Sequence, residues 1–177
     1  LRVWVAGVAT GEEAYSVAIL LADALGGEQE FIGRRVQIFA TDIDVRALET
    51  ARRGIYPVAA LSDVPEDFRD RFFIPKGDQV EVVGFLRQSI LFADHNLFQE
   101  PPFLNIDLIS LRNVLIYFNP SLQEVVLGRM HYAMKDDALL FLGTSENVSA
   151  MGAFFEASSF GEKIFRKRRI GGKVAVP

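Results

Sequence analysis

Cysteine is absent from this chain of 177 residues, which excludes a disulfide framework, a thiolate zinc site and a cysteine nucleophile. Long apolar runs are absent as well. The richest stretch, residues 14–25, is interrupted by Ser16 and Asp23, and nothing approaches the ~18 residues of a membrane span. The chain has only two histidines, His95 and His131, far apart in sequence. We therefore expect no membrane insertion and no metal site.

Positive charge is in the minority, with a formal net charge of −4. A uniformly basic nucleic-acid surface is therefore not expected, and the short basic cluster at residues 166–169 is interpreted as a solvated strand end. No signal-peptide pattern is present. The lack of cysteine is compatible with the cytoplasm, which is the location we expect. Leu1 opens directly onto a core strand, so we expect a trimmed domain, residues 1–177, that something normally precedes.

The first third of the chain alternates between strand and helix patterns. An apolar run at 3–6 ends in Gly7, a helical pattern covers 12–25, a second apolar run covers 36–40, and a second helical pattern covers 45–53. This βαβ order is typical of a parallel sheet covered by helices. The predicted fold class is α/β with a doubly wound, Rossmann-like sheet.

The rest of the chain adds an insertion and completes the sheet. A helix at 65–73 and strands at 79–83 and 85–92 predict a small antiparallel β insertion over about 74–93, with its turn at Lys76-Gly77-Asp78. Further predictions are a strand at 106–110, a helix at 121–134 with Asn119-Pro120 at its start, a strand at 138–142, and a terminal pair at 154–155 and 163–168.

The turn at residues 6–13, Ala-Gly-Val-Ala-Thr-Gly-Glu-Glu, lies between the first strand and the first helix. Ligands of open α/β sheets bind at such strand ends, and glycines allow close approach to the backbone. Glu12 and Glu13 would repel a pyrophosphate, and the loop lacks both Gly-x-Gly-x-x-Gly and the P-loop pattern. The structural alternative is that the two glutamates only complement the dipole of the helix that they begin. The charge favours a cationic ligand.

Asp42 ends the second predicted strand, where an acidic residue can accept hydrogen bonds from ribose hydroxyls. Capping of the following helix is the alternative role. Asp44 is better placed for capping, which leaves Asp42 for a ligand. Together, the acidic turn and Asp42 predict a nucleoside site.

Two further segments interrupt apolar sequence with polar side chains. Arg112, Asn113 and Tyr117 follow the predicted strand 106–110, where a guanidinium suits a carboxylate; an ion pair and a packed aromatic ring are the structural alternatives. Asn96 lies just before Pro101-Pro102 and is placed to read an adenine edge through its amide. His131 falls inside a helix as a surface or packing residue.

The chain resembles the CheR family of chemotaxis receptor methyltransferases. The resemblance rests on residues 6–16, on Ala-Thr-Asp-Ile-Asp at 40–44, on Arg-Asn-Val-Leu-Ile-Tyr-Phe at 112–118 and on Leu-Phe-Leu-Gly-Thr-Ser-Glu-Asn at 140–147. Segments 95–103 and 163–168 resemble the branch often fused to a methylesterase and sensory domains. The resemblance implies transfer of a methyl group from S-adenosylmethionine to glutamates on receptor helices, leaving S-adenosylhomocysteine.

The resemblance also implies roles for individual residues. Glu12 or Glu13 and Arg112 would border the methionine end, Asp42 would hold the ribose, and Asn96 and Leu97 would line the adenine. Arg112 and Tyr117 are the candidate catalytic residues. The full set of candidate cofactor-binding residues is Ala6, Gly7, Thr10, Glu12, Glu13, Asp42, Ile43, Asn96, Leu97, Leu111, Arg112 and Asn113.

The chain departs from the family pattern at three places. The N-terminal helical domain is absent from these residues, and Leu111 replaces a residue that is often cysteine. The turn at Lys76-Gly77-Asp78 is shorter than the glycine-containing loop of members that dock on a receptor's C-terminal pentapeptide. We therefore expect no docking of that peptide.

Three other functions compete with this one. A non-catalytic sensor or adaptor of a fused signalling protein is the main alternative. Nucleic-acid methylation is disfavoured because Glu100-Pro101-Pro102-Phe103 has the wrong first residue and precedes its strand. A nicotinamide dehydrogenase is disfavoured by the acidic loop without Gly-x-Gly-x-x-Gly.

Overall fold

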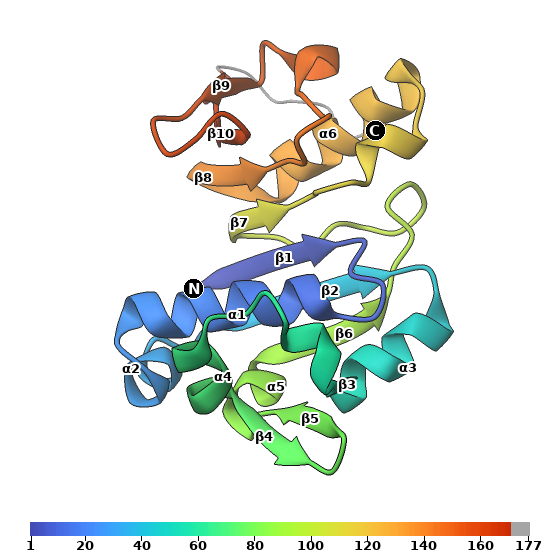
Figure 1. The fold of residues 1–177 in the computed structure, drawn as a ribbon. Coiled ribbons are helices and arrows are strands. Elements are labelled where there is room, and N and C mark those ends of the chain that lie inside the picture. Colours follow the sequence, from blue (N-terminus) through green and yellow to red (C-terminus); the bar gives the residue numbers. More distant parts are fainter. Residues whose placement is uncertain (171–177) are drawn as a thin grey trace. The chain divides into compact units, whose positions relative to one another are not determined.

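The computed structural model describes residues 1–170. They fall into two compact units, a terminal unit (residues 1–7 and 95–170) and a middle unit (residues 8–94). Figure 1 shows their helices and strands, coloured along the chain.

The terminal unit is built on strands that are parallel at one end and antiparallel at the other. In order, these are β1 (Arg2–Ala6), β7 (Ile106–Ser110), β8 (Met134–Phe141), β10 (Ile164–Lys167) and β9 (Phe155–Ala157). β7 runs parallel to both β1 and β8, whereas β10 runs antiparallel to β8 and β9. The strands predicted at 3–6 and 106–110 and the terminal pair are confirmed, and the strand predicted at 138–142 is confirmed except that β8 begins earlier, at Met134.

Helix α6 (Pro120–Ala133) connects β7 to β8. The side chain of Asn119 accepts a hydrogen bond from the backbone N–H of Leu122, and Pro120 occupies the first turn, where it has no N–H to leave unpaired. The buried positions Val126, Leu127 and Met130 recur at helical spacing. The predicted helix at 121–134 is confirmed within one residue at each end. The unit also contains the short 3-10 turns η2 (Leu115–Tyr117) and η3 (Ser149–Met151).

The middle unit combines a parallel strand pair with helices and a small antiparallel sheet. β2 (Gln37–Asp42) pairs in parallel with β6 (Ile90–Asp94). The helices are α1 (Glu12–Leu25), α2 (Glu28–Gly33), α3 (Val45–Arg53), α4 (Glu66–Phe72), α5 (Gly84–Ser89) and the 3-10 turn η1 (Val58–Leu61). The antiparallel sheet has the order β3 (Ile55–Pro57), β5 (Gln79–Val82), β4 (Phe73–Lys76).

Local sequence signals place the first two long helices of this unit. α1 covers the predicted residues and ends at Gly26 in the left-handed conformation. α3 begins after Asp44, whose side chain accepts hydrogen bonds from the backbone N–H groups of Arg46 and Ala47. It ends at Gly54, with φ +62°. The prediction that Asp44 caps α3 is therefore confirmed.

The strand predicted at 85–92 is wrong. Residues Gly84–Ser89 form α5, which buries Leu86 completely, while Arg87 donates from Nε to the carbonyl of Val82. Strand β6 begins only at Ile90, where buried and exposed side chains alternate. Since Leu86, Ile90 and Phe92 suit a helix followed by a strand as well as one continuous strand, the pattern alone did not separate the two.

The boundaries of the insertion change accordingly. Its strands lie within residues 55–82 rather than 74–93. β6 is not part of it, because β6 pairs in parallel with β2, and β3 is part of it, because β3 pairs with β5. The predicted turn at Lys76-Gly77-Asp78 is confirmed as the link between β4 and β5. β3, β4 and α2 were not predicted, since each is only three to six residues long.

The α/β fold class with a small antiparallel insertion is confirmed. In the middle unit α1 and α3 contact β2, and α3 and α5 contact β6. No helix among residues 1–170 combines the length and apolar character of a membrane span.

Candidate functional site

Asp42 joins the end of β2 to the loop that precedes α1. Its Oδ2 accepts a hydrogen bond from the backbone N–H of Ala9 at 2.8 Å, and its Oδ1 accepts one from the N–H of Asp44 at 2.9 Å. Beside it, the N–H of Val8 donates to the carbonyl of Thr41. The loop at residues 8–11 is thus fixed to the carboxyl end of β2.

Asp44 caps the helix as predicted, and Asp42 has in addition the structural role of holding this loop. Asp42 is only partly buried, and an ionised carboxylate has about four acceptor sites. Two of these are used by backbone N–H groups. The remaining ones can accept hydroxyl groups of a ligand.

The start of α1 is acidic and tightly packed. The hydroxyl of Thr10 donates to Oε2 of Glu12 at 2.6 Å, and the hydroxyl of Tyr56 donates to the carbonyl of Thr10 at 2.7 Å. Burial raises the pKa of Tyr56 above its usual value, so its hydroxyl stays protonated as a donor. Gly11 has φ +97°, and a Cβ there would lie 2.7 Å from Cβ of Ala51. Only glycine fits this position without strain.

The other predicted residues of the middle unit lie at the same two strand-to-helix turns. Glu13 is partly buried in the first turn of α1. Ile43 is 73% exposed between Asp42 and Asp44, which suits contact with a flat apolar ligand group. The structure therefore brings the candidates Thr10, Glu12, Asp42 and Ile43 into the two turns that the Asp42–Ala9 hydrogen bond connects.

In the terminal unit, the end of β1 meets the segment that follows β7, residues 111–117 (the 111–117 loop). Ala6 is fully buried, and Gly7 has φ +72°. A Cβ on Gly7 would lie 2.6 Å from Cγ2 of Val114. The N–H of Leu111, which is also fully buried, donates to the carbonyl of Phe141.

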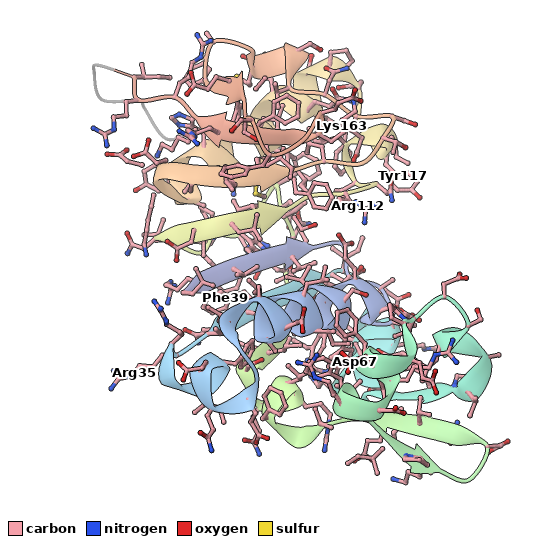
Figure 2. All side chains as sticks on the ribbon, turned by 60° about the vertical axis from the view of Figure 1, so that its left-hand side comes forward. Arg35, Phe39, Asp67, Arg112, Tyr117 and Lys163 are labelled. Carbon is pink, nitrogen blue, oxygen red and sulfur yellow. The ribbon has the colours of Figure 1, made fainter. Side chains whose placement is uncertain are left out.

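Arg112 and Tyr117 extend from the 111–117 loop, as Figure 2 shows. The guanidinium Cζ of Arg112 lies 4.9 Å from the ring centroid of Phe141. Its Nε is buried and has no hydrogen-bond partner among the described residues, while the residue as a whole is only partly buried. Tyr117 is 78% exposed. The alternative in which it is a packed aromatic is wrong, because its ring is not in the core.

Glu146 holds the same loop through the backbone N–H groups of the loop. It is 3% exposed, and its carboxylate accepts four backbone hydrogen bonds. Oε1 accepts from Asn113 at 2.7 Å and Gly143 at 2.8 Å. Oε2 accepts from Val114 at 3.0 Å and Ile116 at 3.3 Å.

The segment after His95 is held by local hydrogen bonds. Oδ1 of Asn96 accepts from the N–H of Phe98, and the N–H of Asn96 donates to the side chain of Glu100. The side-chain Nδ2 of Asn96 can donate to a ligand. Leu97 beside it is partly buried. The ring of His95 packs edge-on against Trp4 at 5.3 Å, and Nε2 lies 2.9 Å from the carbonyl of Pro101.

A family model identifies the chain. The model described as "CheR methyltransferase, SAM binding domain" matches residues 1–164. The chain belongs to the CheR methyltransferase family. S-Adenosylmethionine is the ligand for which this family domain is named.

Individual relatives agree with the CheR assignment. The chain is 41% identical over 157 residues to the chemotaxis protein methyltransferase of Salmonella typhimurium, covering 84% of this chain and 52% of that protein. It is 39% identical over 153 residues to chemotaxis protein methyltransferase 2 of Pseudomonas aeruginosa, covering 83% and 53%. It is 44% identical over 173 residues to an uncharacterised 104.1 kDa protein of Rhodobacter capsulatus, covering 97% and 18%. This CheR chain thus spans about half, or less, of these relatives.

Sequence reasoning assigned no role to two residues that help to hold the 111–117 loop in place. Glu146 lies in the segment 140–147 used for the resemblance, but no role was predicted for it. A glutamate three residues after a strand-ending glycine, Gly143, is the signal that was available. Lys163 was also missed; its ammonium donates to the backbone carbonyl of Glu146 at 2.6 Å. His131 is a packing residue, since it is buried against Phe154 and Phe155.

Proposed function

We propose that this chain is the catalytic domain of an S-adenosylmethionine-dependent protein-glutamate O-methyltransferase that acts on chemotaxis-type receptors. One observation carries the proposal: in a CheR-family domain, the carboxylate of Asp42 ends β2 with two acceptor sites still available. The names of the relatives from Salmonella typhimurium and Pseudomonas aeruginosa support the same activity.

The residues present fit S-adenosylmethionine. The ligand carries an amino group and a sulfonium, both positive, and the start of α1 offers the carboxylates of Glu12 and Glu13. The planar guanidinium of the partly buried Arg112 suits the ligand's carboxylate. Asp42 suits the ribose hydroxyls, as acidic residues at this strand end do in nucleoside sites.

The proposed assignment of residues follows this chemistry. In the middle unit, Thr10, Glu12, Glu13, Asp42 and Ile43 would contact the cofactor. In the terminal unit, Gly7, Asn96, Leu97, Arg112 and Asn113 would do so, with Asn96 and Leu97 at the adenine. The candidates Ala6 and Leu111 are fully buried and would support the ends of β1 and β7 instead of contacting the cofactor.

The reaction needs little from the protein beyond positioning. When bound, S-adenosylmethionine supplies an electrophilic methyl group on a sulfonium. A receptor glutamate is already ionised at pH 7, since its usual pKa is about 4.3. Its carboxylate oxygen forms the new bond to the methyl carbon as the carbon–sulfur bond breaks, so no general base is required. Arg112 and Tyr117 orient the carboxylate, and such positioning can supply up to ~7–11 kcal/mol.

The proposed partners are the methyl-accepting helices of a receptor, in the cytoplasm. Docking of a receptor's C-terminal pentapeptide is not part of the proposal, because only Gly77 and Asp78 link β4 to β5. The Rhodobacter capsulatus relative, of which the match covers 18%, supports further fused domains.

The test is calorimetric titration with S-adenosylhomocysteine, comparing Asp42→Ala with Asp44→Ala. Both changes remove a carboxylate that accepts two backbone N–H groups, so their structural losses are similar. Only Asp42 is assigned to the ribose. We expect micromolar binding in wild type and Asp44→Ala, and a loss of about 100-fold in Asp42→Ala, the size of a charged hydrogen-bond pair.

Transfer of labelled methyl from S-adenosylmethionine to a purified receptor signalling domain, with the label released by base, would then establish ester formation. Cofactor binding without transfer to any receptor tried would favour the adaptor function. Absence of binding in wild type would contradict the methyltransferase function and would favour an adaptor that binds no cofactor.

A further inference from the structure

We infer that Glu146 is a positioning residue that sets the conformation of the 111–117 loop and thereby places Arg112 and Tyr117. The inference rests on the proposed function for what those two side chains do. The geometry of the loop itself stands independently of that function.

Most hydrogen bonds of the Glu146 carboxylate are made with the 111–117 loop, which is distant in sequence. Three of the four N–H groups that the carboxylate accepts belong to Asn113, Val114 and Ile116. N–H groups pointing inward from one short segment form a concave anion-binding arrangement. Here the protein's own buried carboxylate fills it, and all of its roughly four acceptor sites are used.

The loop needs such a partner because its backbone is unusual. Asn113 has φ +59°, in the left-handed region that few residues besides glycine, asparagine and aspartate adopt. The N–H groups of Asn113 and Val114 are donated to the two oxygens of one carboxylate, which favours this turn over an extended continuation of β7. Arg112 lies immediately before the turn, and Tyr117 follows it.

The position of Glu146 is itself fixed from two sides. The fourth N–H belongs to Gly143, where a Cβ would lie 2.8 Å from Oε1 of Glu146 and 2.5 Å from Oδ1 of Asn113. Lys163, the residue just before β10, donates from its ammonium group to the backbone carbonyl of Glu146. Glu146 therefore connects the end of β8 and the start of β10 to the loop after β7.

The test compares Glu146→Gln with Glu124→Gln, an equivalent change at an exposed site on α6. Glutamine keeps the shape but turns one oxygen into an NH2 group that faces N–H donors. We expect amide hydrogen exchange at Asn113, Val114 and Ile116 to become about tenfold faster or more, while the amides of α6 keep their rates. We also expect S-adenosylhomocysteine to bind about tenfold more weakly. Glu124→Gln should change neither.

The outcomes separate the two claims. If Glu146→Gln leaves both exchange and affinity within about twofold of wild type, the positioning role is wrong. If wild type does not bind S-adenosylhomocysteine, the proposed function fails, while exchange still decides the positioning role. Should Glu146→Gln not fold, wild-type exchange decides: protection of the three amides supports the role, and exchange at the rate of exposed amides overturns it.

Discussion

Each unit of this protein has a loop that is held by one carboxylate, Asp42 in the middle unit and Glu146 in the terminal unit. The two carboxylates differ in how many hydrogen-bond acceptor sites remain unused. Asp42 accepts one N–H from the loop before α1 and one from its own turn, and it is partly exposed. Glu146 accepts four N–H groups and is buried.

The difference indicates a division of roles. A carboxylate with unused acceptor sites facing solvent can hold a loop and still bind a ligand. A saturated, buried carboxylate can only organise the backbone around it. Acidic residues at strand ends therefore have to be distinguished by how many of their acceptor sites the protein itself occupies.

The largest effect should separate the two carboxylates by stability. Replacing Glu146 with alanine leaves one buried and three part-buried N–H groups without their acceptor, so we expect the free energy of unfolding to fall by about 3–5 kcal/mol. Asp42→Ala should cost about 1–2 kcal/mol, since water can reach its two donors. Urea unfolding measures both. Equal losses would contradict the division of roles.

The two tight glycines offer the next test. Gly11→Ala places a Cβ 2.7 Å from Cβ of Ala51 at φ +97°, so we expect a loss of about 2–4 kcal/mol from overpacking and backbone strain. Gly77→Ala is the control, because φ is +65° and nothing lies within 4 Å of the added atom. It should cost only about 1–2 kcal/mol. Thermal unfolding of both variants checks this, and a control loss as large as that of Gly11→Ala would contradict the steric argument.

Two buried tyrosines sharpen the comparison on the side of Asp42. Tyr56→Phe removes the hydroxyl that donates to Thr10, whereas Tyr15→Phe removes one that donates to Ala51. Each should cost about 1 kcal/mol of stability. Only Tyr56→Phe should also weaken S-adenosylhomocysteine binding, by about three- to tenfold, because only Thr10 belongs to the loop that we propose contacts the cofactor. Equal affinities for the two variants would show that this anchor does not position the loop.

The smallest effect concerns pH and the terminal unit. Burial lowers the pKa of His131 below its usual value, so near pH 6 the unfolded chain binds more protons than the folded one. Its contribution to stability is therefore complete above about pH 6.5 and is lost as pH falls. His131→Gln should flatten the decline in unfolding free energy between pH 7 and pH 5. An unchanged slope would contradict the assignment.

The sequence was sufficient wherever a local signal decides a structure. Asp44 and Asn119-Pro120 start helices α3 and α6 as predicted, and Gly26 and Gly54 end α1 and α3. Capping and left-handed turns depend on a few neighbouring residues, and these are present in the sequence itself. The short motifs likewise carried the family, which residues 1–164 confirm.

Tertiary structure decided the features that depend on distant partners. Residues 84–89 form a helix, and 90–94 alone form a strand, because Ile90 and Phe92 pair alongside Ile38 and Ala40 of β2. A short apolar pattern does not contain that choice. The role of Glu146 depends on N–H groups more than 25 residues earlier in the chain, Asn113, Val114 and Ile116.

Sequence alone therefore determined the fold class and the order of the long helices and main parallel strands, and it supplied candidate residues for a nucleoside site. It did not determine which carboxylate is saturated by backbone N–H groups and which retains acceptor sites. That distinction is made only when loops from separate parts of the chain meet, because hydrogen-bond capacity is divided among groups by their positions in space.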